Sequence, residues 1–147
     1  MREQSYKLES APSFMSFEFV SEGPKGSIHK MVKYTKISEI GIYNLGFGDK
    51  IGDTDDFDDE IVTDNGDSIR VLATVASTVY LFLREYPNAL ISATGSSESR
   101  TRLYRIGIST NLDKIEEDFS VYGIINGQLE KFEKNKNYSV FLISKKY

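Results

Sequence analysis

Three arginines and a glycine–serine loop in the segment Thr94–Arg105 are the residues in this chain that are best suited to chemistry. A short apolar run precedes the loop, and a helix is predicted to begin directly after it. Exposed N–H groups at the start of a helix attract anions, and guanidinium groups add forked hydrogen-bond donors. We therefore predict a site for a phosphate, a nucleotide or a nucleic-acid backbone. Its predicted ligand-binding residues are Gly95, Ser96, Ser97, Arg100, Arg102 and Arg105.

The same segment also has a structural interpretation that needs no ligand. Ser96 or Ser97 would cap the helix, and Glu98 would suit its positive end. The arginines are two and three positions apart, so a helix spreads them around its axis instead of aligning them on one face. Neither of the two standard glycine-rich nucleotide loops is present. Under this interpretation the arginines are solvated or pair with acidic residues.

Residues 49–67 are strongly acidic. They hold nine acids against Lys50 alone, a net charge of −8, whereas the rest of the chain has 17 basic and 13 acidic residues. Clustered carboxylates can bind Ca²⁺, but a calcium-loop frame starting at Asp53 places Asp58 where glycine is required. We therefore expect a solvated loop or a partner for the arginines, with no metal and no cofactor. The remaining body is mildly basic, which suits an anionic ligand.

The residue inventory gives little support to catalysis. The chain has one histidine, His29, and no cysteine, which excludes a thiolate nucleophile, a two-histidine metal site and a disulfide framework. A serine nucleophile would need His29 as its base, and no Gly-x-Ser-x-Gly turn exists. We expect no catalytic residues, so an enzyme acting on a phosphorylated small molecule is the least favoured function.

The hairpin predicted over residues 14–37 offers a different nucleic-acid surface. In it Lys25, Lys30, Lys33 and Lys36 alternate with Met31 and Tyr34. Aromatic side chains that stack on bases, between lysines that follow phosphates, are typical of single-stranded nucleic-acid binders. Alternatively, the lysines protect an edge strand while the aromatic residues face the core.

Hydrophobic periodicity predicts the remaining elements. Strands are expected at 14–20, 27–37, 40–47, 61–62, 89–94 and 138–144, and a hairpin at 121–132 turns at Asn126-Gly127. One helix is predicted over 68–86, with Asp67 or Ser68 as its N-cap and Pro87 ending it. A second is predicted over 97–118, with a break at Gly107 or at Ser109-Thr110.

This order predicts an α+β fold, with a largely antiparallel sheet and two main helices packed on one face. Residues 1–147 are expected to form a single domain, in which residues 1–12 are a loosely ordered N-terminal segment. That segment lacks the apolar centre of a signal peptide, and no apolar run is long enough to span a bilayer. The expected location is therefore the cytoplasm, with no membrane partner.

Several motifs resemble those of a family of small bacterial proteins catalogued only as a domain of unknown function. In chain order they are FxFxSEGPKG (17–26), IYNLGFGD (42–49), TDNGDSxxVLATVAxTV (63–79), ATGSxxSRTRLYRxGI (93–108) and FSVYG (119–123). The resemblance implies the family's fold and no established activity.

The function favoured by these observations is a non-catalytic binding or interaction domain. Its predicted partner is an anionic ligand or a nucleic acid, bound at the loop and helix around Gly95 and Arg105. One alternative is an interaction or oligomerisation module that contacts a second copy or a partner protein. The other is the single-stranded nucleic-acid binder described above.

Overall fold

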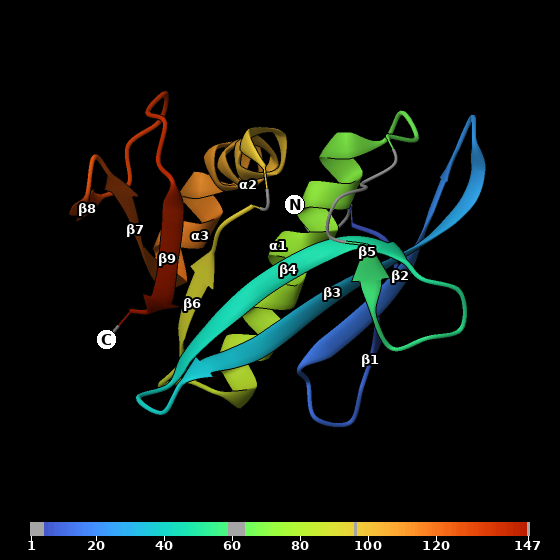
Figure 1. Cartoon of the computed structure of the whole chain (residues 1–147), viewed down its shortest axis with the longest axis horizontal. Helices are drawn as coiled ribbons and strands as arrows, with labels where there is room; N and C mark the ends of the chain where they lie inside the picture. Colours follow the sequence, from blue (N-terminus) through green and yellow to red (C-terminus); the bar gives the residue numbers. More distant parts are fainter. Residues whose placement is uncertain (1–4, 59–63, 96, 147) are drawn as a thin grey trace.

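The computed structural model describes residues 5–58, 64–95 and 97–146, which form nine strands and three helices. In chain order these are β1 (Glu9–Ser10), β2 (Ser16–Gly23), β3 (Gly26–Ser38), β4 (Ile42–Lys50), β5 (Phe57–Asp58), α1 (Ser68–Glu85), β6 (Leu90–Ala93), α2 (Glu98–Thr110), α3 (Leu112–Asp118), β7 (Phe119–Ile125), β8 (Gln128–Lys131) and β9 (Val140–Lys145). The predicted α+β class is confirmed (Figure 1). The strand predicted at 61–62 lies outside the described residues.

One sheet contains all the described strands. Its order is β1-β2-β3-β4-β6-β9-β7-β8, and β5 pairs with β4 beside this path. Among these strands only β4 and β6 run parallel; the other pairs are antiparallel, as predicted for most of the sheet. A parallel pair needs a crossover, which α1 provides. The closing strand β9 lies inside the sheet, between β6 and β7.

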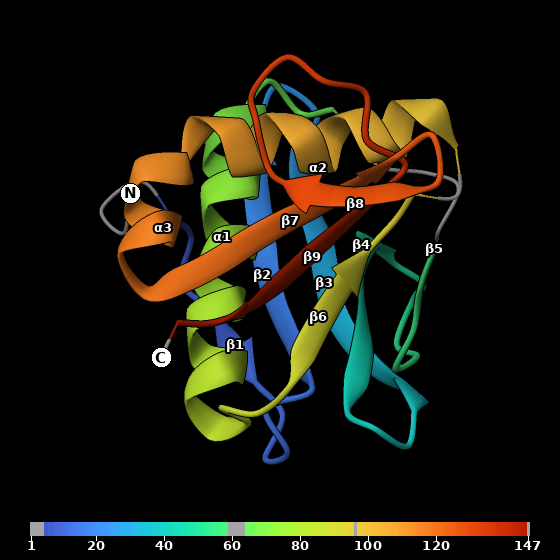
Figure 2. The same ribbon diagram turned by 90° about the vertical axis from the view of Figure 1, so that its left-hand side faces the viewer.

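All three helices pack on the same face of the sheet. Their apolar side chains meet those of β4, β6 and β9 in one core, which includes Leu45, Leu72, Val79, Ala93, Ile108, Ile115 and Ile143. In Figure 2, α2 lies across the first half of α1, where Gly107 faces Leu72. None of the helices in the described ranges is both long and apolar enough to cross a membrane.

Helix α1 is stabilised by burial more than by its intrinsic propensity. Ten of its residues are buried, and they include the β-branched Val71, Thr74 and Val75. Such residues lower helix propensity, so packing against the sheet must compensate. Phe82, for example, stacks on Tyr34 of β3 with a ring separation of 4.1 Å.

The second predicted helix is divided in two, as its sequence suggests. The break lies at Asn111, one residue after the predicted break at Ser109-Thr110. Asn111 ends α2 and begins α3: its backbone N–H and its side-chain amide both donate to the Gly107 carbonyl, at 3.2 and 2.8 Å. Asparagine side chains compete with the helical backbone for such bonds and therefore favour helix ends. The break turns α3 toward β7.

The segment before β1 is part of the core, although residues 1–12 are predicted to be loosely ordered. Tyr6 is buried, its ring stacks on Phe19 at 5.8 Å, and its backbone N–H donates to the Thr74 hydroxyl at 2.8 Å. The Arg70 guanidinium lies over the same ring, 3.8 Å from its centre. Tyr6 alone thus anchors this segment to both α1 and β2. Hydrophobicity averaged over neighbouring residues does not predict such an anchor, because it depends on one side chain and on partners far away in the sequence.

Candidate functional site

The loop before α2 is closed by its own hydrogen bonds. Ser97 is the N-cap of α2, because its hydroxyl accepts a hydrogen bond from the Arg100 N–H at 3.3 Å. The Thr101 hydroxyl accepts from the Gly95 N–H at 3.1 Å and donates to the Ser97 carbonyl at 3.0 Å. A Cβ on Gly95 would lie 2.4 Å from the Thr101 nitrogen, so the loop requires glycine. Part of the predicted donor set therefore serves the loop itself.

Helix α2 directs its three arginines to different places. Arg102 is exposed and Arg105 is half-buried, whereas only 5% of Arg100 is exposed. Two residues along a helix correspond to a rotation of about 200°, which places Arg100 opposite Arg102. The structure thus brings Arg102 and Arg105 together with Gly95 and Ser97 and separates Arg100 from them. Ser96 lies outside the described residues.

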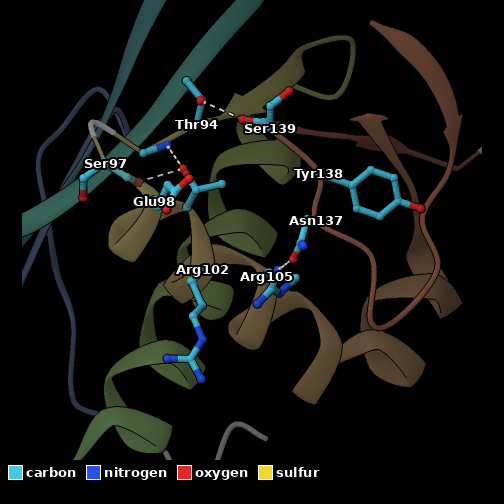
Figure 3. Close-up of a pocket in the computed structure, with 10 residues that line it drawn as sticks. Thr94, Ser97, Glu98, Arg102, Arg105, Asn137, Tyr138 and Ser139 are labelled. Atoms are coloured by element: carbon cyan, nitrogen blue, oxygen red, sulfur yellow. Dashed lines mark hydrogen bonds between the residues drawn. The ribbon is translucent and has the colours of Figure 1, made fainter. Parts of the chain in front are cut away.

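A groove of about 570 Å³ opens beside the start of α2 (Figure 3). Arg102, Arg105 and Glu98 contribute its charged groups. Across the groove, the Asn137 side-chain oxygen accepts a hydrogen bond from Arg105, and the Thr94 hydroxyl donates to the Ser139 carbonyl at 2.9 Å. Its lining residues are Thr94, Gly95, Ser97, Glu98, Thr101, Arg102, Arg105, Asn137, Tyr138 and Ser139. Two arginines with polar neighbours are an arrangement that can hold an anion.

The far wall of the groove is built by the loop between β8 and β9. The Tyr138 hydroxyl donates to Glu130 at 2.7 Å, and Lys136 Nζ donates to the same carboxylate at 2.8 Å. These bonds from Lys136 and then Tyr138 lower the pKa of Glu130 below its usual value. A Cβ on Gly123 would lie 2.3 Å from the Tyr138 ring, which therefore packs directly on the β7 backbone. This network fixes Asn137.

Asn137, Tyr138 and Ser139 are site residues that the sequence does not indicate. Tyr138 is predicted only as the first residue of a strand, and nothing near Asn137 suggests a contact 32 positions earlier in the chain. Their place in the groove follows from the insertion of β9 beside β6, which is a property of the sheet order.

Arg100 belongs to the interior and not to the groove, which corrects its grouping with the surface arginines. One of its terminal nitrogens, Nη2, donates to the Phe47 carbonyl, and its guanidinium carbon lies 5.6 Å from the centre of the Phe47 ring. The other, Nη1, is buried and has no hydrogen-bond partner in the described part of the chain. Burial raises the pKa of the nearby Tyr104 hydroxyl, and the charge of Arg100 partly offsets this.

A comparison with known protein families matches residues 2–146 to a family of unknown function, DUF6934. The chain belongs to this family. The match spans the whole fold, including the groove beside α2 and the interior around Arg100. No curated protein and no solved structure matches the chain. The family resemblance expected from the sequence is thus confirmed, and it brings no activity with it.

In this DUF6934 chain the described acidic residues of the segment 49–67 form no ion pair with the arginines of α2. The ion pairs formed there involve lysines, such as Lys30 with Asp49 at 2.6 Å and Lys50 with Glu18 at 2.7 Å. Lys33 reaches the Asp55 carbonyl at 3.1 Å. In the described residues no cluster of three or more potential metal ligands occurs. Asp59 and Glu60 lie outside these ranges.

The predicted base-stacking surface of the first hairpin is not available on the outside of the sheet. Met31 and Tyr34 are buried in the core, and Lys30 is buried as well. Burial strongly raises the pKa of the Tyr34 hydroxyl, which bonds Thr78 at 2.8 Å. His29 is exposed on β3. The hairpin therefore presents lysines without the interleaved aromatic rings that single-stranded nucleic-acid binding uses.

Proposed function

We propose that this domain is a non-catalytic binding module that holds a phosphate-bearing ligand in the groove beside the start of α2. The observation that carries the proposal is that Arg102 and Arg105 both line one groove. A volume of about 570 Å³ suits a ligand of nucleotide size. Arg100, which the sequence groups with these residues, has no part in the site because it is buried.

The geometry favours recognition of an anion by the two surface arginines. Asn137 holds Arg105 in place, so the guanidinium loses little freedom when a ligand binds. Helix α2 also directs its positive end toward the groove, where Ser97 caps it. Glu98 would repel an anion. The described lining residues of the groove nevertheless carry a net charge of +1, because Arg102 and Arg105 outweigh Glu98.

The groove is better suited to binding than to chemistry. Its described lining residues include no histidine, lysine or aspartate, and Glu98 is their one carboxylate. The Thr101 hydroxyl, a possible nucleophile, is engaged by the loop on both its donor and its acceptor side. General acid–base catalysis requires a positioned acid and base. The described lining residues of the groove supply no such pair.

The proposal is tested by measuring phosphate-dependent binding in variants of the two groove arginines. We expect adenosine triphosphate or a labelled oligonucleotide to bind the wild type with an affinity that falls as salt rises. Arg102→Ala and Arg105→Ala should each weaken binding by about tenfold or more, because a charge-assisted contact is worth roughly 1.5–3 kcal/mol. For an oligonucleotide the slope of log affinity against log salt should fall by about one for each arginine removed.

Arg84→Ala is the matched control, because Arg84 is exposed in the last turn of α1 and does not line the groove. Its affinity should equal that of the wild type. Comparing the nucleotide with the oligonucleotide separates a small-molecule site from a backbone site. Absence of binding at low salt, or equal losses in Arg84→Ala and Arg105→Ala, would refute the proposal.

A further inference from the structure

Glu98 is the residue of the groove that phosphate binding alone does not explain. It is the first residue of α2 and lines the groove together with Arg102 and Arg105. Its charge stabilises the start of the helix, but it would also repel a phosphate. Glu98 precedes Arg102 by four positions, the spacing at which opposite charges on a helix attract each other. The two residues nevertheless form no ion pair, and in Figure 3 the Arg102 side chain extends away from Glu98.

The Glu98 carboxylate can serve a ligand as an acceptor of hydrogen bonds. It is exposed, and an ionised carboxylate accepts hydrogen bonds without donating any. Hydroxyl groups are suitable donors, as in dinucleotide-binding folds, where an acidic side chain accepts a bond from a ribose hydroxyl. The arginines and Glu98 therefore suit two different parts of one ligand, a phosphate and a group that bears hydroxyls.

The neutral residues of the groove add both donors and acceptors. The Asn137 side-chain oxygen accepts from Arg105, which leaves the side-chain NH₂ group as a donor. The Ser139 hydroxyl donates to the Ile124 carbonyl at 3.1 Å, and the Thr94 hydroxyl donates to the Ser139 carbonyl at 2.9 Å. Each of these hydroxyl oxygens can still accept a hydrogen bond. Since a ligand hydroxyl both donates and accepts, it matches this mixed set.

The groove offers no surface on which a nucleobase could stack. Tyr138 is the one aromatic residue among the described lining residues, and only 3% of it is exposed. Its ring packs against Phe132 and Phe141, at 5.3 and 6.0 Å between ring centres. The same lining includes no leucine, isoleucine, valine, methionine or phenylalanine. Bases are bound largely by stacking on exposed rings, so the organic part of a ligand has to be recognised through its polar groups.

From these observations we propose that the ligand of the groove is a sugar phosphate. Its phosphate lies at Arg102 and Arg105, and its hydroxyl groups donate to Glu98. This ligand class rests on the proposed function and narrows it, because the base of a nucleotide would remain outside the groove. A groove of about 570 Å³ has room for a sugar as well as a phosphate. Binding requires no covalent step.

The test compares ribose 5-phosphate with cyclopentylmethyl phosphate. Both are phosphate esters built on a five-membered ring, but only the first has hydroxyl groups on that ring. Binding to the full chain is measured by calorimetry in phosphate-free buffer at low salt. Ribose 5-phosphate should bind about tenfold or more tightly, because a site built to bond hydroxyls rejects an analogue that lacks them. Adenosine 5′-monophosphate should bind within about threefold of ribose 5-phosphate, because its base finds no stacking partner.

Variants of Glu98 test the assigned contact. Glu98→Gln keeps the shape of the side chain and should reduce the preference for ribose 5-phosphate several-fold, since charge-assisted bonds become neutral ones. Glu98→Ala should bring the two affinities to about the same value, because no acceptor remains at this position. In both variants cyclopentylmethyl phosphate should bind more tightly than in the wild type, since a repulsive charge is gone. Glu85→Gln, on an exposed residue outside the groove, is the control and should keep the wild-type preference.

Arginine variants separate the ligand class from the proposed function. Arg102→Ala and Arg105→Ala should weaken both esters alike and leave their ratio unchanged. If both esters bind the wild type equally, or if the preference survives in Glu98→Ala, the sugar phosphate is the wrong ligand class while phosphate binding stands. A more than tenfold advantage of adenosine 5′-monophosphate over ribose 5-phosphate would also overturn it, because a base would then be recognised. If neither ester binds, the proposed function fails together with the ligand class.

Discussion

At the scale of single residues, the Asp67 side chain bonds residues that are distant in the sequence instead of capping its own helix. Its position before α1 marks it as the helix cap, and it does occupy that position. Its carboxylate instead receives hydroxyl groups from Tyr6 and Ser21, which are 61 and 46 positions away in the sequence. It thereby joins the N-terminal segment, β2 and α1 at one atom.

Asp67→Asn should destabilise the domain by about 1–2 kcal/mol, because two charge-assisted hydrogen bonds become neutral ones. The measurement is urea unfolding followed by circular dichroism, with the slope of the transition unchanged. Asp53→Asn, on an exposed residue, serves as the control and should shift the midpoint little. A wild-type midpoint for Asp67→Asn would show that the network contributes nothing to stability.

The arginines of α2 mark the limit of what residue spacing can tell. A rotation of about 100° per residue predicts that Arg100, Arg102 and Arg105 cannot share one face, and the structure agrees. Spacing cannot tell which of them is buried, because the carbonyl that receives Arg100 is that of Phe47, 53 positions earlier. Local patterns therefore predict the helix and its cap but not the composition of the site.

At the scale of elements, the strongest local signals correspond to the observed structure. Asn126 and Gly127 both have positive φ, 53° and 75°, as expected for the tight turn that their sequence predicts between β7 and β8. The loop after β8 has no such signal. It depends on Glu130, where Lys136 and Tyr138 meet, and this contact holds the far wall of the groove.

The loop between β8 and β9 should weaken in acid. Lys136, then Tyr138, lower the pKa of Glu130 in the folded state from its ordinary value of 4.5. Its contribution is therefore complete above pH 4.5 and is lost as the pH falls through the lower folded value. The difference in unfolding free energy between the wild type and Glu130→Gln should be constant from about pH 6 to 8 and should shrink below about pH 4.5.

Glu117→Gln is the control for this titration, since its ion pair with Lys114 is exposed and 3.9 Å long. Exposed pairs of this kind contribute little, so this variant should follow the wild type more closely at every pH. A difference for Glu130→Gln that does not depend on pH would contradict the assignment of the loop to the ionised carboxylate.

At the scale of the whole molecule, the fold joins an N-terminal group of strands to a C-terminal group through β6. The order of strands and helices, and the antiparallel character of most of the sheet, follow from turn signals and periodicity. The position of β9 and the parallel pairing of β6 do not, because several strand orders would satisfy the same hydrophobic pattern. The groove depends on this tertiary arrangement, so it could not be located in full from the sequence.

Tyr6 tests whether the segment before β1 belongs to the global unit. Tyr6→Ala should destabilise the whole domain by about 3–5 kcal/mol, as expected for the loss of a buried aromatic side chain. Thermal unfolding should remain a single transition at a lower temperature. Lys7→Ala, on an exposed neighbour, should stay within about 0.5 kcal/mol. A wild-type transition for Tyr6→Ala would mean that this segment contributes little to stability.

The central position of β9 has a consequence for biosynthesis. Until residues 140–145 leave the ribosome, β6 can pair with β4 on one edge, but the backbone groups of its other edge stay unpaired. The edge of β7 that pairs with β9 in the finished sheet is unpaired as well. Unpaired edges of this kind can template aggregation. A nascent chain stalled before β9, or a message truncated there, would produce a species that needs chaperone protection. Among the described strands, β9 is the one that joins β6 to β7 and so removes both unpaired edges.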